Sequence, residues 1–272
     1  MTTTTENRTT AAQVASLLRP RPAVTHSDIS ITSRLGNYAV YLAGTLSEVR
    51  EAQRLRYKVF VEEFGAHLQK RIAGHDIDMF DAYCDHLIVR DLESDRVVGT
   101  YRILAPHMAK EVGIYYAENE FFLDRLASLR NGMVEVGRSC VHREHRSGAV
   151  IGLLWAGLAS YRSQGGYDHL VGCASISISD GGHNAANFFA SLDPAAMAPI
   201  EYQVFPRNPL PWERLADGAE PVVPPLIKGY LRAGAWICGE PAWDPDFNSA
   251  DLPIVLPMAR IKQRYARRFV KD

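Results

Sequence analysis

The sequence predicts an α/β protein in which helices flank a mixed sheet, and two adjoining stretches carry most of this prediction. In residues 133–142, Val134 and Val136 alternate with Glu135 and a glycine. This is the two-residue period of a strand that places its valines on one face. A basic, glycine-containing turn follows, and residues 150–161 then form an apolar run. That run is too long for an ordinary strand and is typical of a buried helix.

The rest of the chain alternates strands and helices in the same way. A helix start is expected at Thr45 or Ser47, because either residue can serve as the N-cap for the helically spaced apolar residues that follow. Apolar runs bounded by turn residues predict the strands. They are residues 38–43, 86–90, 96–104, 133–142, 170–176 and 254–256.

Composition divides the chain into four parts. Residues 1–27 form a polar leader that two prolines interrupt, and residues 28–190 form the α/β core. Residues 191–258 are rich in proline and are expected to be a loop-rich elaboration of the same domain. Residues 259–272 are basic with interleaved apolar residues, which predicts an amphipathic tail helix. This helix is either solvated or in contact with an anionic membrane or an acidic protein.

Overall composition excludes several function classes. The 272 residues are 47% hydrophobic, and the net charge of −1 argues against nucleic acid as a partner. The four cysteines include no C-x-x-C pair, so neither zinc nor a disulfide framework is predicted. No apolar run is long enough to span a membrane. We therefore expect a cytoplasmic protein with free thiols and no metal.

An acidic segment at residues 74–85 is the first candidate binding site. Asp76, Asp78 and Asp81 lie there among apolar residues. The glycine and the terminal glutamate of an EF-hand are absent, so calcium is not expected. A partly shielded carboxylate cluster favours an ammonium group, whereas a solvated acidic loop is the ordinary alternative.

Glu135 and the turn after its strand form the second candidate. A carboxylate in an apolar strand has its pKa raised towards the range of a general base, although an ion pair with Arg138 or Arg102 is an equal alternative. The strand, the basic turn and the following helix present backbone N–H groups to an anion, typically a phosphate. His142 and His145 in this turn are either a base or phosphate contacts or, more simply, solvated loop residues.

Five short motifs occur in the same order as in the acyl-homoserine-lactone (autoinducer) synthases, which the chain resembles over residues 50–145. They are Arg56 to Phe60, Asp76-x-Asp78-x-x-Asp81, Gly99-Thr100-Tyr101-Arg102, the aromatic pair Phe121 and Phe122, and Glu135-Val136-Gly137-Arg138. The chain resembles the bacterial ornithine N-acyltransferases over its full length. The further matches are residues 154–158, 172–175, 223–232 and 244–248, with a departure at 176–180.

This resemblance implies the GNAT fold, a mixed sheet with a splayed pair of central strands. It implies transfer of a 3-hydroxyacyl chain to the α-amino group of ornithine, which gives lyso-ornithine lipid. The donor would be carried on the phosphopantetheine arm of acyl carrier protein, so no separate cofactor is expected. A basic docking surface and a location at the inner face of the cytoplasmic membrane follow from these partners.

The resemblance also implies roles for individual residues. Glu135 and Arg138 would be catalytic, and backbone N–H groups near Arg138 would stabilise the oxyanion. Asp76, Asp78, Asp81, Arg102, Arg56 and Phe60 would bind ornithine. Phe121, Phe122, Val141, Arg143, Arg146 and Gly148 would bind the acyl-phosphopantetheine group.

Two other functions remain open from the sequence. An autoinducer synthase would use S-adenosylmethionine and release a lactone, and such enzymes lack the long C-terminal half. A non-catalytic protein that binds an acyl carrier or a lipid is the second alternative.

Overall fold

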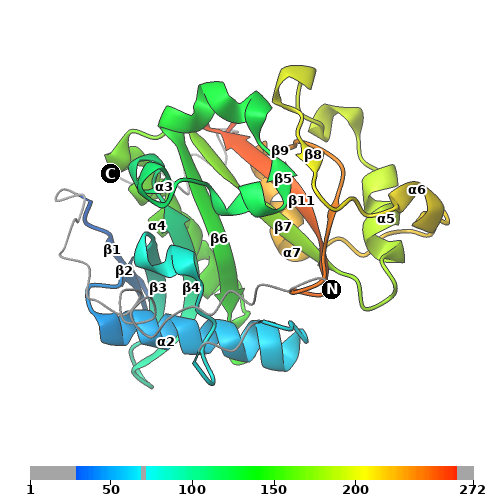
Figure 1. Cartoon of the computed structure of the whole chain (residues 1–272). Coiled ribbons are helices and arrows are strands. Elements are labelled where there is room, and N and C mark those ends of the chain that lie inside the picture. The colour runs from blue at the N-terminus through cyan, green and yellow to red at the C-terminus, as the bar shows by residue number, and fades with distance from the viewer. Residues whose placement is uncertain (1–28, 69–71, 262–272) are drawn as a thin grey trace, which may run out of the picture.

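A nine-stranded sheet dominates the computed structural model, which describes residues 29–68 and 72–261. The strands run in the order β1-β2-β3-β4-β6-β7-β11-β10, and β9 also pairs with β11 (Figure 1). Their bounds are β1 Thr32–Leu35, β2 Tyr38–Leu42, β3 Asp85–Asp91, β4 Arg96–Leu104, β6 Met133–Val141, β7 His169–Ser177, β9 Trp236–Ile237, β10 Ala242–Asp244 and β11 Ser249–Pro257. Two short strands, β5 Phe121–Phe122 and β8 Phe205–Pro206, pair separately.

The only parallel pair in this described sheet is β6 with β7, and it is short. Three residue pairs connect the two nine-residue strands, and the last of them joins Glu135 to Val171. Beyond that point β6 pairs only with β4, and β7 pairs only with β11. The strands therefore separate at the centre of the sheet, which confirms the splayed pair expected from the resemblance.

Two helices, α2 and α4, begin close to where the sequence predicts. Thr45 caps α2 (Leu46–Tyr57), because its hydroxyl accepts from the Glu48 N–H while the Glu48 carboxylate accepts from the Thr45 N–H. Helix α4 (Ala149–Gly165) extends past the predicted run on both sides. The other α-helices are α3 Pro106–Val112, α5 His183–Ala190, α6 Trp212–Leu215 and α7 Pro225–Ala233. The shorter helical segments are η1 Lys58–Glu63, η2 Met79–Ala82, η3 Tyr116–Asn119, η4 Asp124–Gly132, η5 Arg143–His145, η6 Pro194–Ala196, η7 Ile200–Tyr202 and η8 Met258–Arg260.

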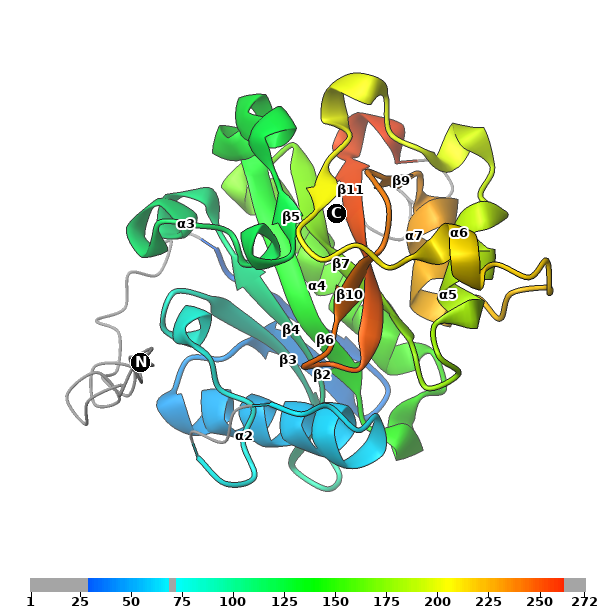
Figure 2. The same ribbon diagram turned by 45° about the vertical axis from the view of Figure 1, so that its right-hand side comes forward.

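Different layers cover the two faces of the sheet. Helix α4 packs against one face of the sheet (Figure 2). Leu87 and Tyr101 lie in the buried cluster on this face. Helix α2 packs on the opposite face, where Leu55 joins a buried cluster with Ile88 and Cys140. Since side chains alternate along a strand, each central strand of the sheet contributes residues both to the α4 layer and to the α2 layer.

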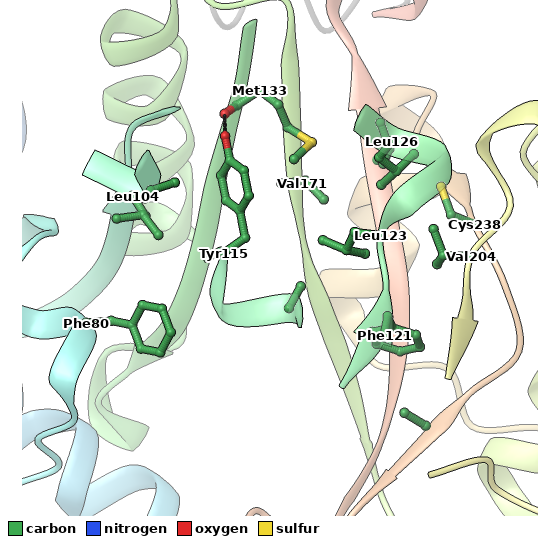
Figure 3. Packing of buried hydrophobic residues seen from close by; sticks show 14 of the residues in the cluster. Phe80, Leu104, Tyr115, Phe121, Leu123, Leu126, Met133, Val171, Val204 and Cys238 are labelled. Carbon is green, nitrogen blue, oxygen red and sulfur yellow. Dashed lines mark hydrogen bonds between the residues drawn. The ribbon is translucent and has the colours of Figure 1, made fainter. Parts of the chain in front are cut away.

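A third layer covers the sheet on the same face as α2, but on the other side of the splay. Residues between β4 and β6 pack there on the strands, with Tyr115 and Leu126 fully buried (Figure 3). The Tyr115 hydroxyl donates to the Met133 carbonyl at 2.9 Å, which ties this layer to β6.

The C-terminal segment contributes more regular structure than its prolines suggested. All nine residues of β11 are buried, and the strand pairs with β7 along its whole length. Pro253 lies inside it, and its carbonyl accepts from the Cys238 N–H at 2.7 Å. The Cys238 carbonyl, which a proline cannot satisfy, accepts instead from the Val204 N–H at 2.7 Å. The leader and most of the tail helix lie outside the described residues. No helix within the described ranges combines the length and apolarity that crossing a bilayer demands.

Candidate active site

A cavity of about 1020 Å³ lies where β6 and β7 separate, and it is lined from both faces of the sheet. Such a cavity has the size of a small-molecule site. Its wall includes Arg102, Glu135, Cys173 and Asp251 from one face and Tyr101, Val136, Trp155, Ala174 and Tyr230 from the other. The cavity therefore passes through the sheet, so an acyl donor and an acceptor can meet in it from opposite sides.

A β-bulge lies on β6 beside this cavity. Thr100 pairs with Cys140 and Arg102 with Gly137, so Tyr101 faces two residues of β6. One of these two residues, Arg138, has a φ of 49°, which is unusual for a side-chain-bearing residue in a strand. A bulge leaves backbone N–H groups without partners on the neighbouring strand. This bulge lies in the segment of β6 where the donors to the oxyanion are expected.

The acidic segment folds into a buried cluster with arginine. The Asp78 side chain caps η2 by accepting from the N–H groups of Phe80 and Asp81. Arg56 is fully buried, and its guanidinium lies 2.9 Å from Asp76 Oδ2 and 2.8 Å from Asp81 Oδ1. Burial alone would raise the pKa of Asp81, but Arg56 and then Arg102 outweigh it and hold that pKa far below its usual range. The solvated-loop alternative for this segment was wrong.

Two further arginines stand between this cluster and the cavity. Arg102 Nη1 lies 2.7 Å from Asp78 Oδ1, and Arg138 contacts Asp76 at 3.2 Å and Asp78 at 3.1 Å. Both arginines line the cavity, whereas the three aspartates do not. Three arginines thus balance three carboxylates, and the side turned to the cavity is cationic. The expected ammonium-binding role of Asp76, Asp78 and Asp81 is not supported by this placement.

Glu135 lies on the wall of the cavity but does not form the ion pair considered as its alternative role. Its Oε2 accepts from the Tyr116 N–H at 2.6 Å, and its Oε1 accepts from the Ala117 N–H at 2.7 Å. Burial raises the pKa of Glu135 to about 7, against the lowering effect of these two amides. The carboxylate therefore anchors η3 and can exchange a proton near neutral pH.

The basic turn contributes to the cavity in part. Val141, Arg146 and Gly148 line the cavity, but Arg143 does not. Gly148 has a φ of 96°, which only glycine adopts readily, and it places α4 with its N-terminus at the cavity. His142 is 3% exposed, so the expectation that it is a solvated loop residue was wrong.

The predicted aromatic pair lies elsewhere. Phe121 is fully buried in the layer over β6, whereas Phe122 is exposed with Arg207 over its ring. Neither residue lines the cavity. Their expected part in acyl binding is therefore not supported, while Phe60 does line the cavity. The order of the motifs along the chain does not say which side of a strand faces a cavity. Two adjacent strand residues point to opposite sides, so the motif alone cannot place either ring.

The far side of the cavity is mostly apolar and aromatic. The rings of Trp155 and Tyr230 stack with their centroids 5.5 Å apart, and the Tyr101 and Tyr230 hydroxyl groups lie 2.5 Å apart. Ile151 and Leu226 add apolar surface. Such a wall suits an acyl chain, because burying its methylene groups is favourable.

Sequence reasoning missed a group of acids on the opposite wall. Asp244 and Asp251 line the cavity beside Cys173, and Glu120 has a carboxylate oxygen within 4.8 Å of ligand atoms of Asp251 and Cys173. These residues come from three distant parts of the chain. The available signal was the alternation of Ser249 and Asp251 in a strand that is otherwise apolar.

Comparisons with known proteins agree with this architecture. Residues 55–156 match the family model described as acetyltransferase (GNAT) domain, which confirms the predicted fold. A protein of Rhizobium meliloti (strain 1021) called L-ornithine N(alpha)-acyltransferase is 34% identical over 274 residues, which cover 93% of this chain and 90% of that protein. A protein of the same name from Brucella abortus (strain 2308) is also 34% identical, over 90% of this chain and 95% of its own length.

A solved structure is similar at lower identity. It is a CoA-dependent acyl-homoserine lactone synthase, BjaI, with SAM and isopentyl-CoA. It is 18% identical, with a TM-score of 0.48, and the match covers 84% of this chain and 85% of the synthase.

Proposed function

We propose that this chain, which belongs to the L-ornithine N(alpha)-acyltransferase family, transfers a 3-hydroxyacyl chain from acyl carrier protein to the α-amino group of ornithine. The product is lyso-ornithine lipid. The observation that carries the proposal is the cavity through the splayed strands, which combines two cavity-facing guanidinium groups, a carboxylate and an apolar aromatic wall.

The acceptor carboxylate binds to Arg102 and Arg138. Both guanidinium groups face the cavity and are held in position by aspartates behind them. Arginine suits this role, since its planar N–H groups match a carboxylate in two-point contact. The same contact places the α-amino group of the acceptor near the β6 bulge.

Glu135 acts as the general base. An α-ammonium group is largely protonated at neutral pH, so it must lose a proton before its nitrogen attacks. With a pKa of about 7, the Glu135 carboxylate takes that proton directly or through water. The amine nitrogen then bonds to the thioester carbonyl carbon, and N–H groups at the bulge stabilise the oxyanion. The carbon–sulfur bond breaks, and the second proton of the attacking nitrogen passes to the leaving sulfur, so that an amide and a thiol are formed.

The donor approaches from the side of α4. The phosphate of the phosphopantetheine arm binds at the α4 N-terminus beside Arg146, and the acyl chain extends along Trp155 and Tyr230. Acyl carrier protein is acidic as a class, so Arg143, Arg146 and Lys58 serve as its docking surface, and added salt weakens the complex. The enzyme works in the cytoplasm, where its amphiphilic product enters the inner face of the membrane.

Mass spectrometry of the products tests the proposal. Purified protein is incubated with a 3-hydroxyacyl carrier protein or the matching coenzyme A thioester, and with L-ornithine, putrescine or S-adenosylmethionine. N-acyl-ornithine from the carrier-protein donor supports the proposal, and putrescine, which lacks a carboxylate, should react poorly. A product from S-adenosylmethionine alone would identify a lactone synthase instead. No acylation of any acceptor would favour a non-catalytic carrier-binding protein.

Arg138→Lys adds a test of the acceptor site. The substitution keeps the charge but removes the two-point contact, so the KM for ornithine should rise more than kcat falls. Arg125→Lys is the matched control, because Arg125 lies outside the cavity with its guanidinium over Phe205. Equal kinetics of the two variants would exclude Arg138 as the carboxylate ligand.

A further inference from the structure

Three carboxylates, which we call the acid wall, gather at one side of the cavity: Asp244 and Asp251 line it, and Glu120, outside the lining, lies close to Asp251. Asp251 and Asp244 are on β11 and β10, and both line the cavity. Glu120 precedes β5 and approaches Asp251 from the covering layer, with one carboxylate oxygen within 4.8 Å of an Asp251 oxygen. The sequence predicted no role for any of the three, although Asp244 begins the matched residues 244–248.

The hydrogen bonds of the acid wall are few. Asp251 accepts from the Ser249 hydroxyl at 2.9 Å, and Asp244 accepts from the backbone N–H groups of Asp246 and Phe247. Both carboxylate oxygens of Glu120 are buried, and their polar neighbours are the acidic Asp251 and the weakly donating Cys173 thiol rather than a cation. Buried carboxylates are normally paired with a strong donor or a cation, so a buried acid whose neighbours are another acid and a thiol indicates that a cationic partner is missing.

No cationic side chain neutralises the acid wall within residues 29–68 and 72–261. None of its carboxylates forms an ion pair there with lysine, arginine or histidine. The contrast with the cluster around Arg56 is direct, because each aspartate of that cluster contacts an arginine. Burial and the neighbouring Asp251 charge raise the pKa of Glu120 well above its usual value, and burial raises that of Asp244 to about 6. A cation placed here would gain strongly from the low dielectric.

The acid wall is also next to the arginines that face the cavity. The Arg138 guanidinium lies 4.3 Å from the centre of the Phe247 ring, and the Phe247 N–H donates to Asp244. Phe247 therefore lies between the cationic Arg138 and the anionic Asp244. An amino acid whose carboxylate contacts Arg138 can direct a side-chain cation towards Asp244 and Asp251.

We propose that the acid wall holds the side-chain ammonium group of the acceptor, so that Glu120, Asp244 and Asp251 select amino acids with a cationic side chain. This inference rests on the proposed function, since it assumes that the acceptor is an amino acid bound in this cavity. It assigns the ammonium contact to a wall other than the aspartates around Arg56, which arginines already neutralise.

A metal ion is the other cation that three such residues attract. Cys173 offers a third ligand atom close to Glu120 and Asp251. Burial, followed by the charges of Glu120 and Asp251, raises the pKa of the Cys173 thiol well above its usual value. A protonated thiol is a poor metal ligand, because metals bind the thiolate. The ammonium group therefore fits the wall better.

The test compares L-ornithine with L-norvaline, which has the same backbone and chain but no side-chain amine. Asp251→Asn and Glu120→Gln keep the shape of the wall and remove its charge. For each variant kcat/KM for ornithine should fall by about tenfold to hundredfold, whereas kcat/KM for norvaline should stay the same or rise. Glu213→Gln, an exposed change outside the cavity, is the control and should alter neither value.

Each other outcome has a separate meaning. Equal losses for both acceptors would show that the acid wall only supports the fold and would overturn the inference. If the wild type acylates both acceptors equally well, the proposed acyl transfer stands and the selectivity inference fails. If EDTA abolishes the preference for ornithine and a divalent metal restores it, the cation is a metal. If neither acceptor is acylated, the proposed function fails. Calorimetric binding of L-ornithine to the wild type and Asp251→Asn then decides the inference.

Discussion

A Cβ atom on Gly172 would lie 2.3 Å from the backbone carbonyl oxygen of Val136. These two residues lie just beyond the last parallel pair of β6 and β7, where the strands separate. The close approach has a backbone atom as its partner, which cannot turn aside as a side chain can. Gly172 therefore fixes where the splay begins and, with it, the position of the cavity.

Gly172→Ala should destabilise the protein and alter the cavity. The added methyl group pushes β7 away from β6, and such overpacking costs about 1–3 kcal/mol. Urea denaturation measures the free energy of unfolding. Gly137→Ala on β6 is the matched control, because a Cβ there meets no atom within 4 Å. Similar stability of the two variants would show that the contact with Val136 relaxes at no cost.

Arg56→Met should be among the most destabilising single changes in the α2 helix. It leaves Asp76 and Asp81 buried without their main cation, and removing one partner of a buried ion pair costs about 3–5 kcal/mol. Arg54→Met is the control on the same helix, since Arg54 is exposed. Thermal or urea unfolding compares the two. A loss for Arg56→Met no larger than for Arg54→Met would mean that the remaining arginines compensate.

The regular elements around β6 were predictable because their causes are local. The alternation of Val134 and Val136 with Glu135, and the Thr45 cap with Glu48 three residues later, depend on neighbours in the chain. The short parallel overlap of β6 with β7 was expected only through the resemblance. Nothing in the composition of either strand sets how many residues they share.

The partners of the charged residues were not predictable, because they are set by packing across the sheet. Asp76 was singled out as an acid, but Arg56 reaches it from a helix twenty residues earlier. Asp251 meets Glu120 only because β11 and the layer before β6 both pack at the splay. The sequence marks such residues as acidic and gives no sign of whether an arginine neutralises them.

Glu135→Gln should change both the rate and its pH dependence. The carboxylate acts as a base only when ionised, so acylation by the wild type should fall as the pH drops through about 7. The variant should lack this fall and be slower by about 10²–10⁴-fold. A stopped assay of N-acyl-ornithine between about pH 5.5 and about pH 8.5 measures both effects.

Glu118→Gln is the matched control for this change. Glu118 anchors the same turn by accepting from the Tyr115 N–H at 2.7 Å, but it does not line the cavity. It should keep the fall in rate at low pH, displaced slightly to lower pH because the Glu118 charge contributes to the raised pKa of Glu135. If Glu135→Gln also keeps this fall, Glu135 only anchors η3, and another group is the base.

Glu120→Gln should stabilise the protein more at high pH than at low pH. A carboxyl group whose pKa is higher in the folded than in the unfolded protein holds its proton longer in the fold, so its ionisation disfavours the fold as the pH rises. Glutamine removes that penalty. The gain over the wild type in the free energy of unfolding should therefore be larger at about pH 8 than at about pH 5.5.

This comparison must be made against the wild type at each pH. Burial lowers the pKa of His86 and His142, and these groups make the fold more stable as the pH rises, which is the opposite sign. They are present in both proteins, so their contribution cancels in the difference. Urea unfolding at the two pH values gives that difference directly, with Glu213→Gln as the exposed control. A gain that does not change with pH would show that Glu120 already has a compensating cation, and that the acid wall is not short of one.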